Sequence, residues 1–369
     1  MLYAPCMDEL HARAVLARAP GLTAEALARL TAAAGGDIAV AATARAAARV
    51  ELPPAVRAFL GAPPASRIAA DLEWLAASGA AIILSSDAAY PPLLAATVGA
   101  PAALYVQGPA ALLATPQLAM VGSRSPTPAG RATAMEFAAW FARRGLTVTS
   151  GLATGIDAAS HEGALHGEGA TIAVFGSGLD RVYPAAHRTL AARIRTRGAL
   201  VSEFPPGSAP RAANFPRRNR IIAGLALGTL IVEATRRSGS LITARLAIEA
   251  GREVFAIPGS IHSPLSQGCH QLIKSGAKLV EEAADVMGEL GFSVPKERLG
   301  EAARPRAAAR ELDKEYEMLL DALGFEPATI DSLVARTELP SGSIASMLLI
   351  LELEGRVAAL PGGRFGRIP

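Results

Sequence analysis

Several features that mark common protein classes are scarce or missing in this chain of 369 residues. The two cysteines, Cys6 and Cys269, lie far apart and have no metal-ligand spacing, which excludes a disulfide framework and a Cys/His zinc site. No apolar run reaches the roughly 18 to 20 residues that span a bilayer. The first ten residues include Asp8 and Glu9 in place of a basic signal-peptide region. We therefore expect a cytoplasmic protein with free thiols and no membrane insertion.

Motifs of common enzymes are missing as well. There is no Gly-x-x-x-x-Gly-Lys-Ser/Thr loop for ATP hydrolysis and no Gly-x-Ser-x-Gly nucleophile elbow. The histidines are scattered, and each is more typical of a hydrogen-bonded structural residue than of a catalyst. Asp157 and Asp180 lie beside expected helix starts, where an aspartate is usually a cap. We therefore predict no catalytic residues, no metal site and no cofactor.

The positive charge is carried almost entirely by arginine and is unevenly placed. Lysine occurs four times, and the formal net charge is +3. Residues 181–220 contain nine arginines and one acid, Glu203, whereas residues 311–369 contain ten acids and five basic residues. A genome that favours arginine codons explains arginine over lysine, but it does not explain the missing acids in 181–220. This distribution favours a polyanionic partner for the middle of the chain.

The sequence patterns divide the chain into four parts. Residues 1–67 have short Ala- and Leu-rich helical patterns broken at Ala19–Thr23, with Thr23 as a good N-cap, and we interpret them as a helical helix-hairpin-helix or SAM-like domain. Seven acids balance seven basic residues up to Glu73, which favours a packing role over DNA binding. The Pro- and Ala-rich segment Gly61–Ser66 is interpreted as the linker that follows.

Residues 68–293 alternate apolar strands with helical patterns such as 129–143 and 241–250. Most of the strands are continuous apolar runs, as is typical of strands covered on both faces. The fold class that we predict is α/β, an extended Rossmann-like, doubly wound and mostly parallel sheet. The expected strands are Ala81–Leu84, Ala103–Val106, Leu118–Val121, Leu146–Thr149, Thr171–Phe175, Leu200–Ser202, Leu227–Val232, Glu253–Ile257 and Lys278–Val280.

The end of the chain has a different composition. Residues 294–310 are polar and contain Pro295 and Pro305, so we predict a linker there. Residues 311–369 show three helical patterns and a hairpin, which together predict a winged helix. Its expected recognition helix carries Glu352 and Glu354 and no basic residue before Arg356. A surface of this charge repels phosphate, so protein contact or autoregulation is favoured over DNA binding.

Four of the expected strands are followed by a loop rich in glycine or serine that leads into a helix. Glycine allows the backbone to approach a ligand closely, and a helix N-terminus favours an anion. Since parallel strands end at one edge of the sheet, these loops are expected to form a row of phosphate sites. The candidate ligand residues in these loops are Gly122, Ser123, Arg124, Ser150, Gly151, Gly155, Gly176, Gly178, Ser238, Gly239 and Ser240.

A second candidate is the run Phe215-Pro216-Arg217-Arg218-Asn219-Arg220, which directly precedes the apolar stretch Ile221–Leu225. Guanidinium groups match phosphate geometry and are rarely set against buried residues for stability alone. We predict that Arg217 and Arg218 contact the anion, while Asn219 and Arg220 mainly brace the loop. Phe215 is a candidate platform for base stacking and equally a candidate core anchor. Aromatic residues make up 5% of the chain, so binding is expected to be largely electrostatic.

These motifs together resemble the DNA-processing protein A (DprA/Smf) family across the whole middle domain. In many members a basic residue follows the Tyr-Pro pair, whereas Ala185 stands there in this chain, so that contact is either missing or supplied by Arg181 or Arg188. The segments that carry the resemblance are Gly122-Ser123-Arg124, Ser150–Asp157, Gly176–Pro184, Ser202–Pro205, Phe215–Leu225, Ser238–Ala244, Gly251–Val254, Pro258-Gly259 and Gly268–Ala277.

The resemblance implies a cytoplasmic homodimer that binds single-stranded DNA taken up in natural transformation and helps to load RecA onto it. It implies a recombination mediator and not an enzyme. Carried onto this chain, it makes Arg124, Arg217, Arg218 and Arg220 the leading phosphate ligands.

Two alternatives remain open at this point. The first is a nucleotide N-glycoside hydrolase of the lysine-decarboxylase-like group, which has a related Rossmann-like scaffold. Those enzymes use a Pro-Gly-Gly-x-Gly-Thr-x-x-Glu loop, whereas the nearest stretch here, Ser238–Leu241, is followed by no acid until Glu249. The second is a protein-interaction module in which the arginine run is a structural ion-pair network. That interpretation needs acids nearby, and Glu203 and Glu233 are the obvious local ones.

Overall fold

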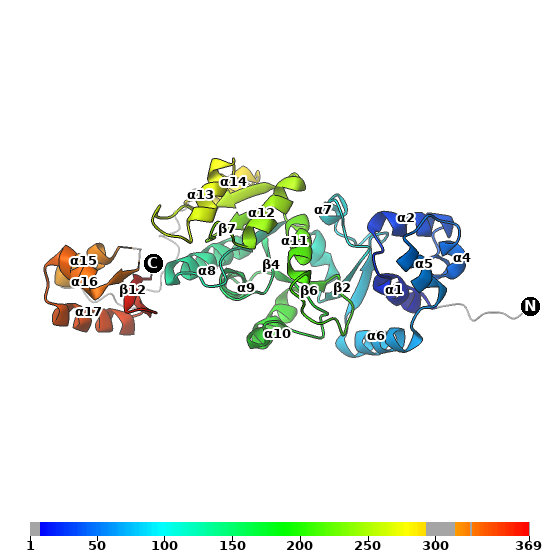
Figure 1. The fold of residues 1–369 in the computed structure, drawn as a ribbon, viewed down its shortest axis with the longest axis horizontal. Helices are drawn as coiled ribbons and strands as arrows, with labels where there is room; N and C mark the ends of the chain where they lie inside the picture. The colour runs from blue at the N-terminus through cyan, green and yellow to red at the C-terminus, as the bar shows by residue number, and fades with distance from the viewer. Residues whose placement is uncertain (1–7, 293–313, 325–326, 369) are drawn as a thin grey trace, which may run out of the picture.

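The computed structural model describes residues 8–292, 314–324 and 327–368. Figure 1 shows an elongated molecule with a helical segment at the N-terminal end, a large sheet in the middle and a small C-terminal module at the other end. The predicted linker 294–310 lies outside the described residues.

The N-terminal segment, from residue 8 onward, consists of six helices. Thr23 is the N-cap of the second helix and accepts a hydrogen bond from the backbone N–H of Ala26, as predicted. The helices bury a shared apolar cluster that includes Leu16, Leu27 and Leu30. The six helices are α1 (Glu9–Arg18), α2 (Ala24–Ala33), α3 (Ile38–Ala41), α4 (Ala44–Ala47), α5 (Pro54–Gly61) and α6 (Ala65–Ser78).

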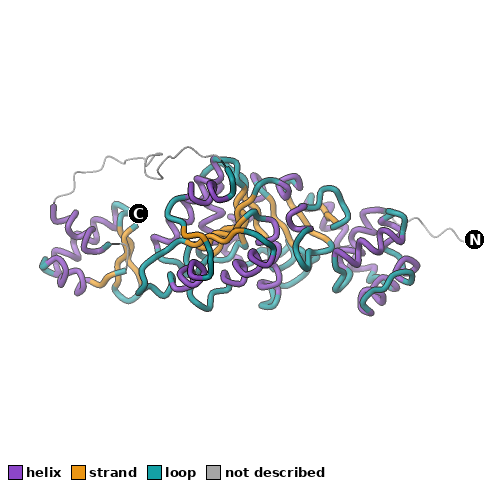
Figure 2. Tube along the Cα trace, turned by 90° about the horizontal axis from the view of Figure 1, so that it is seen from above, coloured by secondary structure: helices purple, strands orange, loops and turns teal. Residues whose placement is uncertain are grey.

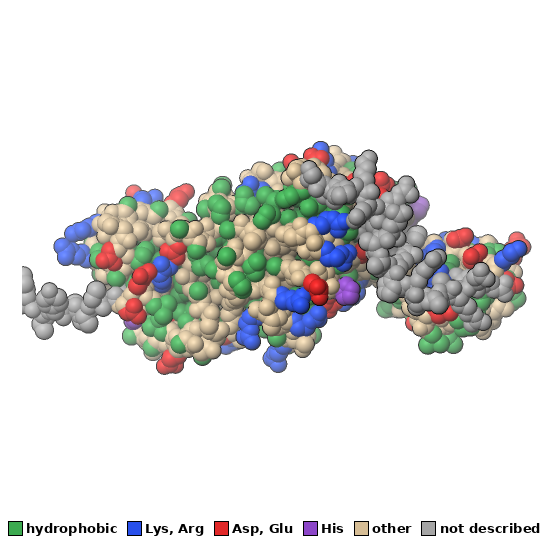
Figure 3. Space-filling view, turned by 180° about the vertical axis from the view of Figure 1, so that it is seen from behind, with side chains coloured by type: hydrophobic (Ala, Val, Ile, Leu, Met, Phe, Trp, Pro, Cys, Tyr) green, Lys and Arg blue, Asp and Glu red, His purple; other side chains and the backbone are tan. Residues whose placement is uncertain are grey.

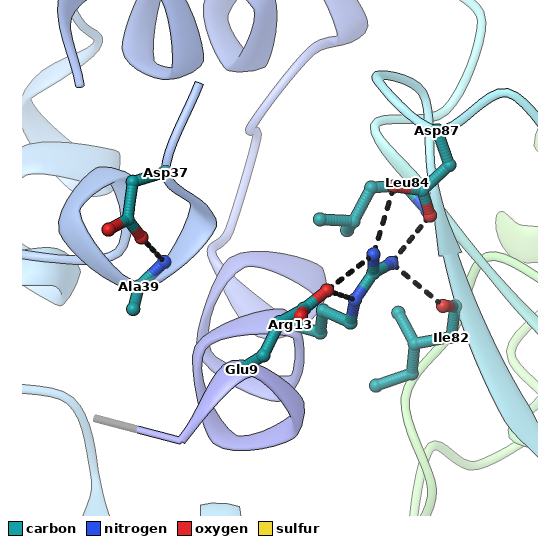
Figure 4. A network of polar contacts seen from close by, with 7 residues as sticks. All are labelled: Glu9, Arg13, Asp37, Ala39, Ile82, Leu84 and Asp87. Carbon is teal, nitrogen blue, oxygen red and sulfur yellow. Dashed lines mark hydrogen bonds and ion pairs between the residues drawn. The ribbon is translucent and has the colours of Figure 1, made fainter. Parts of the chain in front are cut away.

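This helical segment is packed directly onto the sheet. The Arg13 guanidinium on α1 donates to the carbonyl of Ile82, which lies on the first strand, and to the carboxylate of Asp87, which follows that strand (Figure 4). The hydrogen bond to Asp87 raises the pKa of Arg13. Arg18, at the end of α1, pairs with Asp71 on α6 and donates to the carbonyl of Pro206 at 2.9 Å. These bonds and the apolar cluster join the helices to the sheet.

The boundary between these parts differs from the one expected. Residues 61–66 do not form an extended linker, because α5 ends at Gly61 and α6 begins at Ala65. The expected boundary at residue 67 therefore lies inside α6. The physical reason is that α6 buries Ile68 and Leu75 in the same apolar cluster as Leu16 and the strand residue Leu84. The sequence shows the prolines of this segment but not the packing that makes the helix continuous.

The central sheet has nine strands in the order β1-β2-β6-β5-β4-β3-β7-β8-β9. The pairs β1–β2 and β2–β6 are antiparallel, and the other six neighbouring pairs are parallel. The predicted mostly parallel, Rossmann-like sheet is confirmed. The strands are β1 (Ala81–Leu84), β2 (Ala103–Gln107), β3 (Gln117–Val121), β4 (Thr147–Ser150), β5 (Thr171–Val174), β6 (Ala199–Ser202), β7 (Gly228–Ile231), β8 (Glu253–Ala256) and β9 (Lys278–Leu279).

Helices cover both faces of this sheet, which explains why its inner strands are buried along their whole length (Figure 2). Along β3, Leu118 and Met120 pack on one face, while Ala119 and Val121 pack on the other. The helical elements of this part are α7 (Pro92–Ala95), η1 (Ala110–Ala114), α8 (Pro128–Arg143), α9 (Ile156–His166), η2 (Ala185–His187), α10 (Arg188–Arg197), α11 (Asn214–Leu225), α12 (Ser240–Glu249), α13 (Gln267–Lys274) and α14 (Ala283–Glu289).

The C-terminal module is a winged helix, as predicted. Its three short strands form a sheet in the order β10-β12-β11, and its helices bury Leu319, Leu333 and Leu348 against it. Strand β12 lies against the first turn of α8, where Gly366 faces Pro128 (Figure 1). The elements are α15 (Lys314–Leu323), β10 (Ala328–Thr329), α16 (Ile330–Thr337), α17 (Ser341–Leu353), β11 (Val357–Leu360) and β12 (Arg364–Arg367).

Within the part of the chain that the structure describes, no helix combines the length and the apolar character required to cross a membrane.

Candidate functional site

The four candidate loops lie side by side at the carboxyl edge of the sheet. They follow β5, β4, β3 and β7, which are neighbours in this order. The N-termini of α9, α8 and α12 open directly from three of these loops. Each N-terminus leaves backbone N–H groups without helical partners and carries a partial positive charge. The predicted row of loops is therefore formed, and its backbone suits an anion.

A cleft of about 790 Å³ opens along this edge. Asp157 is the acid among its lining residues, and its carboxylate is engaged by the backbone N–H groups of Gly151 and Ala153. A second cavity of about 740 Å³ lies between β9 and α14 and is lined by four carboxylates, which disfavour phosphate. The predicted residues that line the cleft are Gly122, Ser123, Arg124, Phe215, Arg218, Asn219, Ser238, Gly239 and Ser240.

The loop after β3 places Arg124 at the mouth of the cleft. Gly122 is required there, because an added Cβ would lie 2.7 Å from Ile156 and 2.9 Å from the carbonyl of Glu233. The backbone N–H of Ile156 donates to the carbonyl of Ser123, which ties this loop to the start of α9. The Arg124 side chain is exposed, and its guanidinium lies 5.9 Å from the centre of the Phe215 ring. Arg124 forms no ion pair with any described residue, so its charge is available to a ligand.

The loop after β4 has a structural role in this arrangement. Ser150 is fully buried, and its hydroxyl donates to the carbonyl of Met120 at 2.6 Å. Gly151 lies under the guanidinium of Arg218, where a Cβ would be 2.3 Å from a guanidinium nitrogen. Gly155 has a φ of 81° and lies against the backbone of Arg124. These three predicted residues shape the cleft from behind and do not line it.

The loop after β5 supports an aromatic pair. Gly176 lies beneath the Phe215 ring, which a Cβ at this position would approach to 2.9 Å. Gly178 donates its backbone N–H to the carbonyl of Ser208 and is buried. The Phe215 ring centre lies 5.5 Å from that of Tyr183, which is 53% exposed and lines the cleft. Tyr183 was not among the residues predicted to bind the ligand. Its position shortly after Gly176-x-Gly178, which follows a strand, was the signal that could have identified it.

The arginine run lies in a helix and not in a loop. It forms the first half of α11, whose second half buries Ile221, Ile222 and Leu225. Pro216 is tolerated because the N–H groups of a first helical turn have no helical partner. This corrects the expectation that the run is a loop. A helix turns successive side chains by about 100°, so the members of the run face different surroundings.

Arg218 points into the protein. It is 4% exposed and donates to the carbonyl of Gly151 at 2.6 Å and to that of Val174, which are at or near the ends of β4 and β5. Burial lowers the pKa of Arg218 to about 10, with Asp157 acting against this shift, so the guanidinium stays charged at neutral pH. Burial also raises the pKa of Asp157, and Arg218 opposes that shift. Arg218 therefore holds two strand ends together beside a buried carboxylate.

Arg217 and Arg220 share the carboxylate of Glu203. Arg217 is 58% exposed and pairs with Glu203 at 2.9 Å, while Arg220 is 18% exposed and pairs with the same oxygen. The protein-interaction alternative requires a structural ion-pair network of this kind. The network with Glu203 includes only two of the four arginines predicted as ligands, because Arg124 and Arg218 are not part of it. The expected division within the run is therefore altered: Arg218 braces the strands from a buried position, and Arg217 is the exposed member.

The loop after β7 adds two serines and two arginines to the edge. The hydroxyls of Ser238 and Ser240 lie 2.7 Å apart, and the backbone N–H of Ser240 donates to Ser238. Gly239 between them is exposed, and an added Cβ there would meet no atom within 4 Å. Arg236 and Arg237 are exposed on the same loop, and the sequence patterns did not identify them as ligands. Their position between β7 and Ser238, in a predicted anion-binding loop, was the signal that could have identified them.

Glu233 fixes the first turn of α8 beside Arg124. Its carboxylate accepts hydrogen bonds from the backbone N–H of Thr127 at 2.9 Å and from the Thr127 hydroxyl at 2.6 Å. The same hydroxyl accepts from the backbone N–H of Gly130 and caps the helix. Burial raises the pKa of Glu233, and the two bonds from Thr127 act against this shift. The second alternative expected Glu233 to pair with the arginine run, but this carboxylate bonds to Thr127 instead.

We expect the substitution Thr127→Ala to lower the free energy of unfolding by about 2 to 4 kcal/mol. It removes a helix cap worth about 1 kcal/mol and leaves the half-buried Glu233 carboxylate short of a donor. The matched control is Thr23→Ala, which removes only the cap of α2 and should lower it by about 1 kcal/mol. Urea denaturation measures both, and equal losses in the two variants would contradict a role for the Thr127–Glu233 bond.

Two stretches of the chain match the sequence models of known families. Residues 81–291 match that of the family described as DNA recombination-mediator protein A, and residues 303–363 match that of the DprA winged helix domain. The chain is 44% identical over 306 residues to Protein Smf of Escherichia coli K12, an alignment that covers 81% of each chain. It is 48% identical over 206 residues to the DNA processing protein DprA of Streptococcus pneumoniae, covering 56% of this chain and 73% of that one.

Two solved structures are also similar. The first is DNA processing protein A from Streptococcus pneumoniae, with a TM-score of 0.64 and 36% identity over 77% of this chain and 97% of that one. The second is DNA processing protein A from Helicobacter pylori, with a TM-score of 0.52 and 28% identity over 57% of this chain and 95% of that one. The structure of the Helicobacter pylori protein concerns its binding mode for single-stranded DNA.

Proposed function

The chain belongs to the DNA recombination-mediator protein A family, and from this premise we propose that its cleft binds single-stranded DNA. We further propose that it helps to load RecA onto that DNA during natural transformation, and that it does so as a cytoplasmic homodimer. In this proposal the protein holds the strand and breaks no bond.

The observation that carries the proposal is the exposed Arg124, which has no ion-pair partner among the described residues, at the mouth of a cleft formed by four loops. Helix N-termini line the same edge, and Arg236 and Arg237 add positive charge. Phosphate contacts of this kind bind any sequence, because the backbone is the same in all. The neighbouring Phe215 and Tyr183 rings offer a stacking surface for one or two bases, which a single strand exposes and a duplex does not. The relation to the Helicobacter pylori protein supports the same ligand.

We expect the protein to bind an oligothymidylate more tightly than a duplex of the same length, with an affinity that falls steeply with salt. For single strands the slope of log affinity against log salt is about −0.7 for each phosphate contact. Fluorescence anisotropy of labelled DNA between about 50 and 200 mM salt measures both quantities. Equal affinity for the single strand and the duplex, or no dependence on salt, would contradict the proposal.

The RecA and dimer parts are tested separately. RecA is expected to form filaments sooner on single strands coated with single-strand-binding protein when this protein is added, which the RecA ATPase rate reports. Sedimentation of the free protein decides whether it is a dimer. A DNA-binding protein without effect on the RecA lag would refute the loading step and leave DNA binding standing.

A further inference from the structure

Helix α10 carries a high positive charge that no acidic residue of the helix balances. Its ten residues, 188–197, contain four arginines and no acid. Figure 3 shows basic side chains along the lower edge of the central part, at the level where Figure 1 places α10. Leu190, Ala191 and Ile194 form its buried face. The arginines Arg188, Arg193, Arg195 and Arg197 are all exposed, and among the described residues none of them has an ion-pair partner.

Helix formation explains only part of this arrangement, because the helix dipole favours Arg195 and Arg197 in the last turn but disfavours Arg188. Arg188 is the first helical residue, where the helix dipole disfavours a positive charge. Arg193 and Arg197 are four residues apart, so their like charges face each other on the helix surface. Each effect opposes the helix by a few tenths of a kcal/mol. A bound anion would relieve both, which supplies a physical reason for Arg188 and Arg193 that helix formation does not.

The helix begins at the edge of the cleft. Tyr183 lines the cleft, and only Pro184 and the short turn η2 separate it from Arg188. The ring of His187, at the N-cap of α10, lies 2.9 Å from the carbonyl of Leu152 in the loop after β4. This contact fastens the first turn of α10 beside the loops that bound the cleft. A strand that leaves the cleft past the Tyr183 ring therefore meets Arg188 first.

We infer that α10 is a track that guides the single strand onward after it leaves the cleft. The inference rests on the proposed function and extends it to a surface outside the cleft. The helix is about 15 Å long, which a stacked strand covers with about four or five nucleotides at 3.4 Å each. Arg188 and Arg195 form one row along it, and Arg193 and Arg197 form a second row. Ala192 and Thr196 lie between the rows, so small side chains leave the path open.

The test compares two lengths of oligothymidylate with one variant. The variant replaces all four arginines of α10 by glutamine (R188Q/R193Q/R195Q/R197Q), which is a good helix former. The short oligonucleotide has about 6 nucleotides and fits the cleft, and the long one has about 20 and reaches beyond it. Of the four arginines the short strand reaches at most Arg188, so we expect its salt slope to fall by no more than about 0.7, and we expect weaker binding of the long strand. For the long strand, two to four lost contacts reduce the salt slope by about 1.4 to 2.8.

The slope converts into a measurable ratio. Raising the salt from about 50 to about 200 mM should weaken wild-type binding of the long strand about 7- to 50-fold more than variant binding. The matched control is R29Q/R45Q/R49Q/R57Q, which removes four exposed arginines from the N-terminal segment. Both variants shift the formal net charge from +3 to −1, because each loses four positive charges. The control should bind both strands like the wild type.

Three results would overturn the track. They are an unchanged slope for the long strand, an equal loss for the short and long strands, and an equal loss in the control variant. The last two would mean that the arginines of α10 act only through the net charge of the protein, which attracts DNA without a specific contact. If the wild-type protein binds neither strand, the proposed function itself fails, and that outcome is distinct from failure of the α10 variant alone. Circular dichroism of both variants confirms that they fold.

Discussion

Replacing Arg124 by alanine is expected to weaken binding of single-stranded DNA about 10- to 100-fold. The side chain is exposed and has no ion-pair partner among the described residues. A charge-assisted, bidentate contact to phosphate contributes about 1.5 to 3 kcal/mol, and each 1.4 kcal/mol is a tenfold change in affinity. The loss should be the same for all base sequences, and the salt slope should fall by about 0.7. Anisotropy titrations with oligonucleotides of different composition measure these effects.

The matched control for this variant is Arg217→Ala. Arg217 is also exposed, but Glu203 already balances its charge at 2.9 Å, and its guanidinium lies over the Phe204 ring. We expect a smaller loss of affinity than for Arg124, because a DNA phosphate must compete with that carboxylate. The sequence patterns made both Arg124 and Arg217 phosphate ligands, whereas the ion pair with Glu203 favours Arg124, so this pair of variants separates the two views. An equal or larger loss for Arg217→Ala would restore the sequence-based view.

The second large effect is on stability. Replacing Arg218 by methionine is expected to lower the free energy of unfolding by about 3 to 5 kcal/mol. Two carbonyl oxygens near the ends of β4 and β5 lose their donor, and the buried Asp157 carboxylate loses the positive charge beside it. Methionine retains much of the apolar stem, so the measured loss reflects mainly the guanidinium. Urea denaturation measures the change.

The effect should depend on pH in a particular direction. Burial already raises the pKa of Asp157 in the folded state, and the loss of Arg218 raises it further. A group with a raised folded pKa binds its proton more tightly in the folded protein, so stability falls as pH rises from the unfolded pKa to the folded one. The difference between wild type and Arg218→Met should therefore be larger at neutral pH than at about pH 5.

The control for this variant is Arg220→Met in the same helix. Glu203 keeps Arg217 as a partner when Arg220 is removed, so no carboxylate is left alone. The loss of stability should be smaller. Equal losses for the two variants, or a loss for Arg218→Met that grows as pH falls, would show that Asp157 does not depend on Arg218.

The sequence was sufficient for the fold and for the position of the candidate loops at one edge of the sheet. Continuous apolar runs predict the buried strands, since only a strand covered on both faces excludes polar side chains. Gly122, Gly151 and Gly176 after three of these runs predict the loops, and the parallel direction brings them to one edge. Thr23 and Thr127 mark helix starts through local hydrogen bonds, which a short segment determines by itself.

Roles within the arginine run required the tertiary structure. A sequence of adjacent arginines does not show that α11 turns Arg218 under Gly151 while it leaves Arg217 exposed. The pairing of Glu203 with both Arg217 and Arg220 joins residues 14 and 17 positions apart. Likewise, the continuity of α6 across the expected boundary depends on packing against α1 in the shared apolar cluster. Such facts depend on contacts between distant segments, which local patterns do not encode.

What the sequence determined by itself is thus the chemistry of the edge: loops that suit an anion, an excess of arginine and a scarcity of acids in 181–220. The tertiary structure decided which arginines face solvent. Among the described residues it leaves Arg124 without an ion-pair partner at the mouth of the cleft and buries Arg218 in the cleft wall. The reason is physical: composition and periodicity specify what each element can bind, whereas burial and ion pairing depend on which elements fold against one another.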